Sequence, residues 1–453
     1  LNDEQLEKGA HGYLSAPVPG VVGGLELART TWGSLDRKVL LADAIALATN
    51  GHRYAPRQAL VLSWFWKRVR KDPVLRAIFG RGKRRDKPLS AGELIKQPSL
   101  AKTLQAIAAA GMKGFYGGDV AAKIVKAMKR GGGLVTAKDL AAYHARVREP
   151  LHIRYRGFDI YTMGPPSMGG VAVVSILLGL EGAGKLSGGP GQASGLHLFI
   201  ESARRAYADR RSVGADPDFV DQKQVAPLLA QLLDASYHGS RQPPIDATKA
   251  TPSAQVRPIQ LSVASKRPES NETTHYSVVD AKGNAVSCTM TLSAAFGAWL
   301  VVPETGVLLS NAMGAFSPAG VNMLKPGKRP ASSMSPTIVV KDGKTVAVVG
   351  SPGGDTIPNT VAQLIVNLID YRMPVDRAVE QGRVHHQYKP DVVRIESKRS
   401  ASAPELAKLT KLGHVIKKSP IPLGDANVLV IDPKTGIAWG YADTRKGGLA
   451  VGP

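Results

Sequence analysis

The sequence predicts an α+β protein with a mainly helical first half and a strand-rich second half. Helical patterns that end at glycine recur before residue 242. A stretch rich in Pro, Gln and Ser with little periodicity, 242–270, follows, and we interpret it as a linker. Alternating apolar and polar runs come after it. With 453 residues, 43% hydrophobic and 21% charged, the chain can form a large core and is not expected to be disordered.

The individual elements follow from cap, turn and periodicity signals. Helical patterns cover residues 35–49, 99–110, 121–130, 196–210 and 360–371. Ser34 is the expected N-cap of the first of these helices, and Asn50-Gly51 is its stop. Strands are expected in pairs, two of them with hairpin turns at 281–284 and 432–436, over residues 275–280 and 285–292, 337–340 and 346–349, and 428–431 and 437–441.

Composition excludes several classes of protein. The single cysteine, Cys288, forbids an intrachain disulfide and any cysteine-built zinc or iron–sulfur site, and we interpret it as a small buried apolar residue. The best apolar run, 169–184, falls short of the roughly 18 residues of a membrane helix and is interrupted by glycine and serine. We therefore expect no membrane span.

The chain is strongly basic. It has 59 Lys and Arg against 36 Asp and Glu, which gives a net charge of +23. Residues 67–87 contain ten basic and two acidic residues and lie beside Trp64, Phe65 and Trp66. Such a segment can contact an anionic surface, although charge runs are usually solvated faces. No nucleic-acid-binding motif accompanies the charge, so nucleic acid is not favoured as a partner.

Three other motifs do not fit their usual functions. Residues 179–185 approach a phosphate-binding loop, but Leu186 stands where a magnesium-binding hydroxyl is required. His385 and His386 are adjacent, and neighbours in sequence seldom share one metal. The string 165–169 lacks the first glycine of a nucleophile elbow. We therefore expect neither a metal nor another cofactor.

The string Glu272-Thr-Thr-His-Tyr-Ser277 stands at the head of an expected strand, directly after the linker. Cleavage of the bond between Glu272 and Thr273 would leave Thr273 with its hydroxyl and a free α-amino group. An α-amine has an ordinary pKa of about 7.7 to 8.0, so it can serve as the general base for that hydroxyl near neutral pH. The alternative is an ordinary strand that begins with threonines, and composition alone favours that alternative.

Further motifs, in the expected order over almost the whole chain, resemble the γ-glutamyltransferase family. The motifs that carry the resemblance are Phe115-Tyr-Gly-Gly118, Asp139-Leu-Ala-Ala-Tyr143, Tyr155-Arg-Gly157, Tyr207-Ala-Asp-Arg210, Asp216-Pro-Asp-Phe219, Thr273-Thr-His-Tyr-Ser277, Gly283-Asn-Ala-Val286, Thr289-Met-Thr291, Phe296-Gly297, Arg329-Pro-Ala-Ser-Ser333, Gly350-Ser-Pro-Gly-Gly354, Arg383-Val-His-His-Gln387 and Asp443-Thr-Arg445.

The resemblance implies a four-layer αββα sandwich of the N-terminal-nucleophile (Ntn) hydrolase type. Residues 1–272 then correspond to the large subunit without its N-terminal part, and residues 273–453 to the small catalytic subunit. The two fragments are expected to remain associated as one intertwined fold after self-cleavage. The family further implies a periplasmic or secreted location.

Six positions match catalytic or substrate-contacting residues of the family. They are Thr273 (nucleophile), Thr291 (second threonine, which orients the nucleophile's amine and hydroxyl), Ser332 and Ser333 (pair near the substrate's α-carboxylate), and Gly353 and Gly354 (backbone donors of the oxyanion hole). Glycines permit close backbone approach to a substrate, and fixed N–H donors stabilise an oxyanion.

Three departures from the family pattern affect the expected substrate. Ser293 stands where the family usually has asparagine, and Ala312 and Ala315 stand where it has glutamine and aspartate. That aspartate normally pairs with the α-ammonium of a γ-glutamyl group. Residues 316–329 also form a shorter lid loop, which favours entry of water. The family's carboxylate-binding arginine is expected in a segment that precedes Leu1.

The resemblance implies an acyl-transfer enzyme that cleaves a small-molecule amide through an acyl-Thr273 intermediate, with hydrolysis favoured over transfer. The first hypothesis for the substrate is a γ-glutamyl amide such as glutathione. The second is a dicarboxylic monoamide that lacks the α-amino group, which the alanines would tolerate. A third hypothesis, from another class, is a binding protein that uses its basic surface on anionic polymers.

Overall fold

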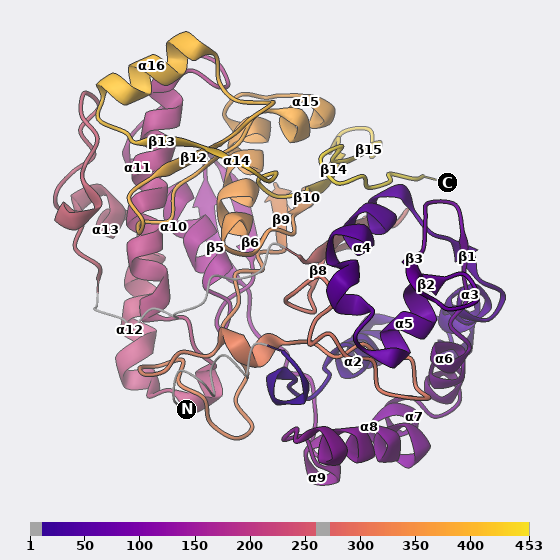
Figure 1. Cartoon of the computed structure of the whole chain (residues 1–453). Helices are drawn as coiled ribbons and strands as arrows, with labels where there is room; N and C mark the ends of the chain where they lie inside the picture. The colour runs from indigo at the N-terminus through magenta and orange to yellow at the C-terminus, as the bar shows by residue number, and fades with distance from the viewer. Residues whose placement is uncertain (1–10, 260–271, 453) are drawn as a thin grey trace. The chain divides into compact units, whose positions relative to one another are not determined.

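The computed structural model describes residues 11–259 and 272–452, which fall into two compact units (Figure 1). Unit 1 comprises Leu1–Val147 and Thr291–Gly314, and unit 2 comprises Arg148–Met290 and Ala315–Pro453. Each unit therefore combines sequence from both sides of the bond between Glu272 and Thr273. The α+β prediction is confirmed, because helices and antiparallel sheets both build the chain. None of the helices in the described ranges is long and apolar enough to cross a bilayer.

Unit 1 is mainly helical. Its helices are α2 (Val21–Trp32), α3 (Arg37–Asn50), α4 (Pro56–Val69), α5 (Pro73–Phe79), α6 (Pro98–Ala110), α7 (Met112–Tyr116), α8 (Gly118–Gly131) and α9 (Ala137–Ala141). Two short strand pairs join β1 (His52–Arg53) to β4 (Leu94–Ile95) and β2 (Gly80–Arg81) to β3 (Lys87–Pro88). The expected N-cap Ser34 is wrong, since the Asp36 carboxylate accepts the Lys38 N–H at 2.7 Å and begins α3 there.

Unit 2 is built on a six-stranded antiparallel sheet in the order β15-β14-β10-β9-β6-β5. The strands are β5 (Leu151–Tyr155), β6 (Phe158–Thr162), β9 (Thr337–Lys341), β10 (Lys344–Gly350), β14 (Asn427–Ile431) and β15 (Ala438–Ala442). Helices α10 (Met168–Gly182) and α14 (Ile357–Ile369) pack against the sheet, α11 (Ala193–Asp209) packs on α10, and the three helices supply most of the apolar core (Figure 1). Nearly every residue of α10 and α14 is buried, because each lies between the sheet and other helices.

Smaller elements complete unit 2. They are α12 (Gln222–Leu232), α13 (Ala235–Ser240), α15 (Val375–Glu380), α16 (Ala403–Lys411), and a three-stranded sheet of β11 (Val384–His385), β12 (Val393–Glu396) and β13 (Ile416–Ser419).

The predicted hairpin after the cleavage point is confirmed as β7 (Thr274–Val279) and β8 (Ala285–Met290). It packs on β10 and β14, on the far side of the sheet from the core helices, so unit 2 has successive layers of helices, sheet and hairpin. Ser277 Oγ donates to Asn427 O at 2.9 Å, and Ser287 Oγ donates to Val349 O at 3.0 Å. Cys288 lies opposite Tyr276 and is partly exposed, so its interpretation as a small buried apolar residue is wrong as to burial.

The predicted linker, 242–270, is not free where the structure describes it. Residues 260–270 lie outside the described ranges, but 242–259 are bound along α11. Arg205 donates to the carbonyls of Pro243 and Pro244 at 3.0 and 3.2 Å. The low periodicity reflects irregular backbone held by such polar contacts, which a pattern of apolar residues does not reveal.

The hairpin contacts the sheet closely where the His275 ring covers Gly350. A Cβ at position 350 would lie 2.1 Å from Cε1 of His275, so only glycine fits there without displacement. His275 is 5% exposed, and burial lowers its pKa to about 4, so its ring is neutral at pH 7.

We expect Gly350→Ala to push the hairpin away from the sheet. Overpacking of this kind costs roughly 1–3 kcal/mol, and urea unfolding monitored by circular dichroism measures it. Gly239→Ala in α13 is the control, because its added methyl group meets no atom within 4 Å. Equal stability of the two variants would contradict the account of the sheet contact.

Candidate active site

Strand β7 runs antiparallel to β10 across the layer contact. His275 lies over Gly350, and Ser277 Oγ lies 3.3 Å from Val348 O, so the two chains advance in opposite directions. Asn427 Nδ2 fixes this alignment by donating to His275 O at 2.9 Å. Continued by two residues, the alignment brings partly buried Thr273 level with Pro352, one residue before Gly353.

The loop after β10 carries Gly353 and Gly354 at φ angles of 140° and 56°, which residues with a side chain rarely adopt. A Cβ on Gly353 would lie 2.4 Å from Thr356 Oγ1. The carbonyl of Gly353 accepts from Thr356 N and Oγ1 at 3.1 and 2.9 Å. Both glycines are buried, and within the described ranges neither of their N–H groups has an acceptor. Because a buried N–H without a partner is costly, these two donors suit an incoming oxygen.

Ser332 and Ser333 lie in an extended segment before β9, at the start of α10. Met168 N donates to Ser332 O at 2.7 Å, and Ser167 Oγ donates to Met334 O at 2.6 Å. Side chains alternate in this segment, so Ser332 is partly exposed whereas Ser333 is fully buried. The Ser333 hydroxyl accepts from Arg210 at 3.0 Å.

Three buried residues connect these segments, and sequence reasoning did not single them out. Arg210 forms an ion pair with Asp355, and Tyr207 Oη donates to Asp355 O at 2.5 Å. Burial acts to raise the pKa of Asp355, but the charge of Arg210 outweighs it and the pKa is lowered. The available signal was the motif Tyr207-Ala-Asp-Arg210, which is part of the family resemblance but had been given no role in the site.

A second carboxyl borders the glycine loop. Asp425 N donates to Ser351 Oγ at 2.9 Å, and Gly424 Cα would lie 3.3 Å from a Cβ on Gly353. Burial, and then the charge of Asp443, raises the pKa of Asp425 to about 6. This carboxyl therefore changes charge in the range in which many enzymes work.

Other predicted site residues belong to unit 1. Thr291 Oγ1 accepts from Ser293 N at 2.8 Å, and Asn311 holds the following turn by accepting from Ala294 N at 2.9 Å. Asn311 N also donates to Leu292 O, which brings Ala312 next to the turn that carries Thr291 and Ser293. Unit 1 thus gathers three of the predicted residues and unit 2 gathers the rest, with Ala315 at the start of its second segment.

The segment expected to form a short lid loop, 316–329, is closed by its own polar side chains. Asn322 Nδ2 donates to Ala315 O at 2.8 Å, and its Oδ1 accepts from Ala331 N at 3.2 Å. Lys328 is 8% exposed, and its ammonium donates to Val321 O and Met323 O. The loop is therefore folded on itself.

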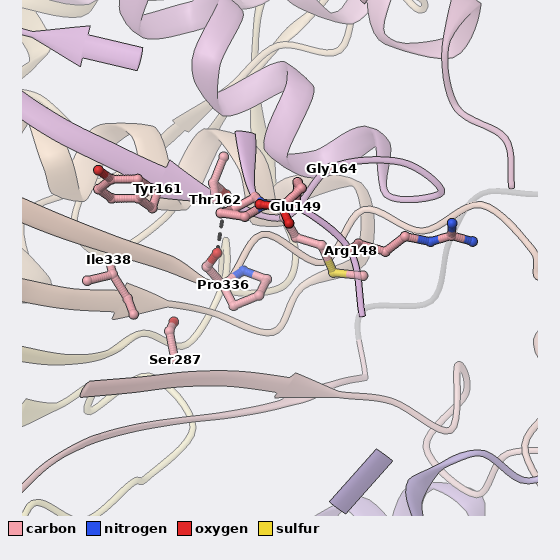
Figure 2. A pocket seen from close by; sticks show the side chains of 10 residues that line it. Arg148, Glu149, Tyr161, Thr162, Gly164, Ser287, Pro336 and Ile338 are labelled. Atoms are coloured by element: carbon pink, nitrogen blue, oxygen red, sulfur yellow. Dashed lines mark hydrogen bonds between the residues drawn. The ribbon is translucent and has the colours of Figure 1, made fainter. Parts of the chain in front are cut away.

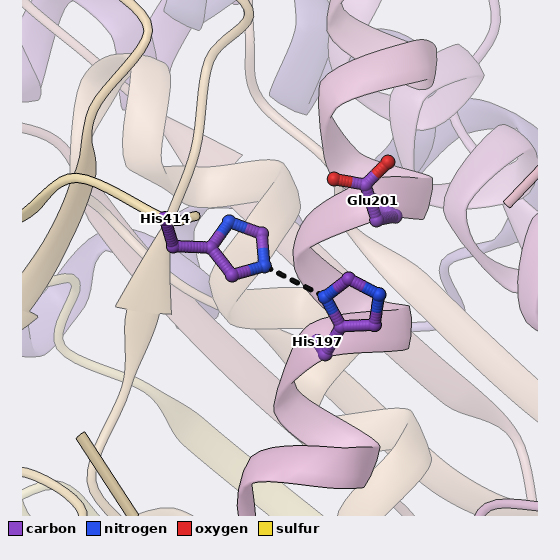
Figure 3. A group of neighbouring side chains, drawn as sticks. All are labelled: His197, Glu201 and His414. Atoms are coloured by element: carbon purple, nitrogen blue, oxygen red, sulfur yellow. Dashed lines mark hydrogen bonds between the residues drawn. The ribbon is translucent and has the colours of Figure 1, made fainter. Parts of the chain in front are cut away.

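Among the described residues, His197, Glu201 and His414 form a buried cluster whose ligand atoms lie within 4.8 Å of one another (Figure 3). His197 Nε2 lies 2.8 Å from Asp246 O and therefore carries the proton, so His197 Nδ1 accepts from His414 Nε2 at 2.8 Å. Glu201 is already paired with Arg204 and Arg205. A dication here would add to two nearby positive charges, so the group fits a polar core cluster better than a metal site.

His385 and His386 face different partners. His385 Nε2 lies 2.8 Å from Gln387 Oε1, and His386 Nε2 lies 3.0 Å from Asp391 Oδ1. A hollow of about 400 Å³ also opens on unit 2, and none of the predicted site residues lines it (Figure 2). Its lining is mostly apolar and comes from β6, β9 and neighbouring segments, among them Tyr161, Pro336 and Ile338.

A threonine that directly precedes an inner strand, whose alignment runs toward a loop with two buried N–H donors, is an arrangement typical of an Ntn hydrolase. The solved structure of cephalosporin acylase from Bacillus halodurans has this fold, with a TM-score of 0.84 and 25% identity over 96% of this chain and 78% of that one.

Sequence comparison agrees with the fold. The profile of the family described as gamma-glutamyltranspeptidase matches residues 1–452. "Glutathione hydrolase proenzyme" of Escherichia coli (strain K12) is 38% identical over 97% of this chain and 75% of its own length. "Acylase ACY 1 proenzyme" of Pseudomonas sp. (strain SE83) is 34% identical over 97% and 77%. The chain belongs to the gamma-glutamyltranspeptidase family and is an enzyme of the Ntn-hydrolase type.

Proposed function

We propose that the chain cleaves itself between Glu272 and Thr273 and then hydrolyses γ-glutamyl or closely related amides through an acyl-Thr273 intermediate. The observation that carries this proposal is the alignment of β7 on β10, because its continuation by two residues points Thr273 toward the glycine loop. The names of the glutathione hydrolase and acylase relatives, both called proenzymes, support it.

In the proposed reaction the Thr273 α-amine takes the proton from the Thr273 hydroxyl, and Oγ attacks the amide carbonyl. The carbonyl oxygen becomes an oxyanion that accepts from the N–H groups of Gly353 and Gly354. Collapse of this intermediate breaks the C–N bond, and the leaving amine receives the proton. Water then attacks the Thr273 ester by the same route and releases the acid.

We expect Thr273→Ala to abolish both self-cleavage and turnover. Loss of a covalent nucleophile lowers kcat by roughly 10⁴-fold or more, since no acyl-enzyme can form. Mass spectrometry counts the fragments, and release of 4-nitroaniline measures turnover. Thr274→Ala is the control, because the Thr274 side chain is exposed on the outward face of β7. Self-cleavage of the Thr273→Ala variant, or release of 4-nitroaniline by it, would contradict the proposal.

A second candidate donor is a dicarboxylic monoamide without an α-amino group. Ala312 and Ala315 favour it, because an α-ammonium placed beside them lacks the counter-charge that the family's aspartate supplies. A buried ammonium without a partner costs several kcal/mol. The acylase relative is consistent with this donor class.

Comparison of γ-glutamyl-4-nitroanilide with glutaryl-4-nitroanilide separates the two donors. If the alanines set the preference, the wild type cleaves the glutaryl compound at least as fast, since the glutaryl group has no ammonium to neutralise. Ala315→Asp should then raise kcat/KM for the γ-glutamyl compound relative to glutaryl by about tenfold, or 1.4 kcal/mol. Exclusive cleavage of the γ-glutamyl donor by the wild type would leave that donor as the substrate and refute the alanine argument.

We also infer an anionic contact through residues 67–87 in unit 1. Trp66 Nε1 donates to Asp86 O at 2.9 Å and holds the basic β2–β3 turn beside α4. Arg57 stacks over Trp64, with its guanidinium carbon 5.0 Å from the ring centroid, and Trp64 is 58% exposed. The carboxylate of Asp72 caps α5, so it is not freely available to neutralise the basic side chains of residues 67–87.

Heparin chromatography tests this contact. Replacement of Lys83, Arg84 and Arg85 by serine should lower the salt concentration at which the protein elutes, because fewer counterions are then released on binding. Serine at Lys411, Lys417 and Lys418, which are also exposed, is the control. Identical elution of the two triple variants would contradict a specific role for residues 67–87.

The family membership supports two further parts of the proposal. The two fragments remain associated after cleavage, and the enzyme acts in the periplasm or outside the cell. Co-elution of the fragments from a sizing column and fractionation of the native host check these two points.

A further inference from the structure

Arg210 links two parts of the site that are far apart in sequence. Its side chain is 1% exposed, and its Nη1 donates to Ser333 Oγ at 3.0 Å while its Nη2 pairs with the Asp355 carboxylate. Ser333 precedes β9, whereas Asp355 directly follows the two glycines that end the loop after β10. One planar guanidinium therefore joins the serine segment to the glycine loop.

Asp355 is held from two sides. Tyr207, one helical turn before Arg210, donates its hydroxyl to Asp355 O at 2.5 Å. The guanidinium carbon of Arg210 lies 4.0 Å from the centroid of the Tyr207 ring, so the two side chains also stack. The carbonyl and the carboxylate of Asp355 are thus both fixed, which restrains the backbone of the residue that directly follows Gly354.

The Gly354 N–H lies in the peptide that joins Gly353 to Gly354, next to this restrained residue, and the Gly353 N–H lies one peptide further back. Gly354 at φ 56° and Gly353 at φ 140° occupy a region that glycine enters readily and also leaves readily. Loss of one well-aimed oxyanion donor costs on the order of 10²- to 10³-fold in kcat. Contacts from other residues are therefore needed to keep both N–H groups in a fixed direction. Asp355, which follows Gly354, receives such contacts from Arg210 and Tyr207.

We propose that Arg210 is a positioning residue: through Asp355 and Ser333 it sets the aim of the Gly353 and Gly354 N–H groups without touching the substrate. This inference rests on the proposed function and adds to it a determinant of the rate of acylation. Arginine is required because lysine is a single point charge and cannot donate to two partners in a fixed fork.

Arg210→Lys tests the inference, with Arg241→Lys as the matched control. Arg241 is also buried and paired with a buried carboxylate at the end of α11, Asp209, but it does not contact the glycine loop. Both variants keep a positive charge beside the carboxylate. We expect Arg210→Lys to lower kcat on the order of 10²-fold, with KM changed by less than about threefold. Arg241→Lys should keep kcat within about twofold even where it lowers the unfolding temperature.

Each enzyme is assayed fully cleaved at residue 273, with whichever 4-nitroanilide the wild type hydrolyses, and single-turnover mixing gives the acylation rate constant. Tyr207→Phe is a second variant that removes one hydroxyl and keeps the ring, so it is expected to fold and to lose about tenfold in acylation. If Arg210→Lys does not fold, Tyr207→Phe alone decides the outcome.

Slow acylation with near-normal KM in the Arg210 or Tyr207 variant, and normal acylation in Arg241→Lys, supports the inference. Equal kcat in the Arg210 and Arg241 variants, or wild-type acylation in Tyr207→Phe, overturns it. A wild-type enzyme that is cleaved at residue 273 but hydrolyses neither donor overturns the proposed function, and the inference with it.

Discussion

The close contact between the His275 ring and Gly350 is the constraint on which the proposed chemistry depends. Two packed layers of a sandwich can shift relative to each other unless complementary packing holds them in one register. Here the His275 ring fills the space that any side chain at position 350 would need. Asn427 locks the same alignment through the His275 carbonyl. Because the proposed nucleophile and the glycine loop belong to different layers, this packing contact and the Asn427 hydrogen bond together set how the two are aligned.

Buried ion pairs hold the remaining parts of unit 2. Arg383 pairs with Asp443, and Arg445 bridges Asp443 and Glu396, with all four side chains buried. Such groups contribute little net stability compared with apolar packing, but removal of one partner is costly. They are therefore suited to fix the ends of strands and loops in one arrangement. Arg210 is also a buried arginine in an ion pair. It differs from Arg383 and Arg445 because its partner Asp355 adjoins the glycine loop, whose N–H groups have no acceptor among the described residues.

The sequence was sufficient for the fold class, the hairpin and the strand pairs, because period-two alternation and turn residues are local signals. It also indicated Thr273 and the glycines through their motifs. It could not indicate Arg210, Tyr207 or Asp355 as a group, since their contacts join positions more than 100 residues apart. The linker interpretation was wrong at 242–259 for a related reason. This segment is held by polar groups that are distant in sequence, and the pattern of apolar residues does not reveal such contacts.

The bound segment 242–259 also bears on what self-cleavage would do. Its partners include the second fragment: Ala250 N donates to Leu412 O at 2.6 Å, and Ser253 N donates to Asp391 Oδ2 at 2.7 Å. Hydrolysis of one peptide bond beyond this anchor would produce a nicked protein rather than two separate products. The new α-amine of Thr273 would gain local freedom, while the first fragment would stay bound through residues 242–259. Maturation would therefore change the chemistry at one nitrogen atom and leave the surrounding fold in place.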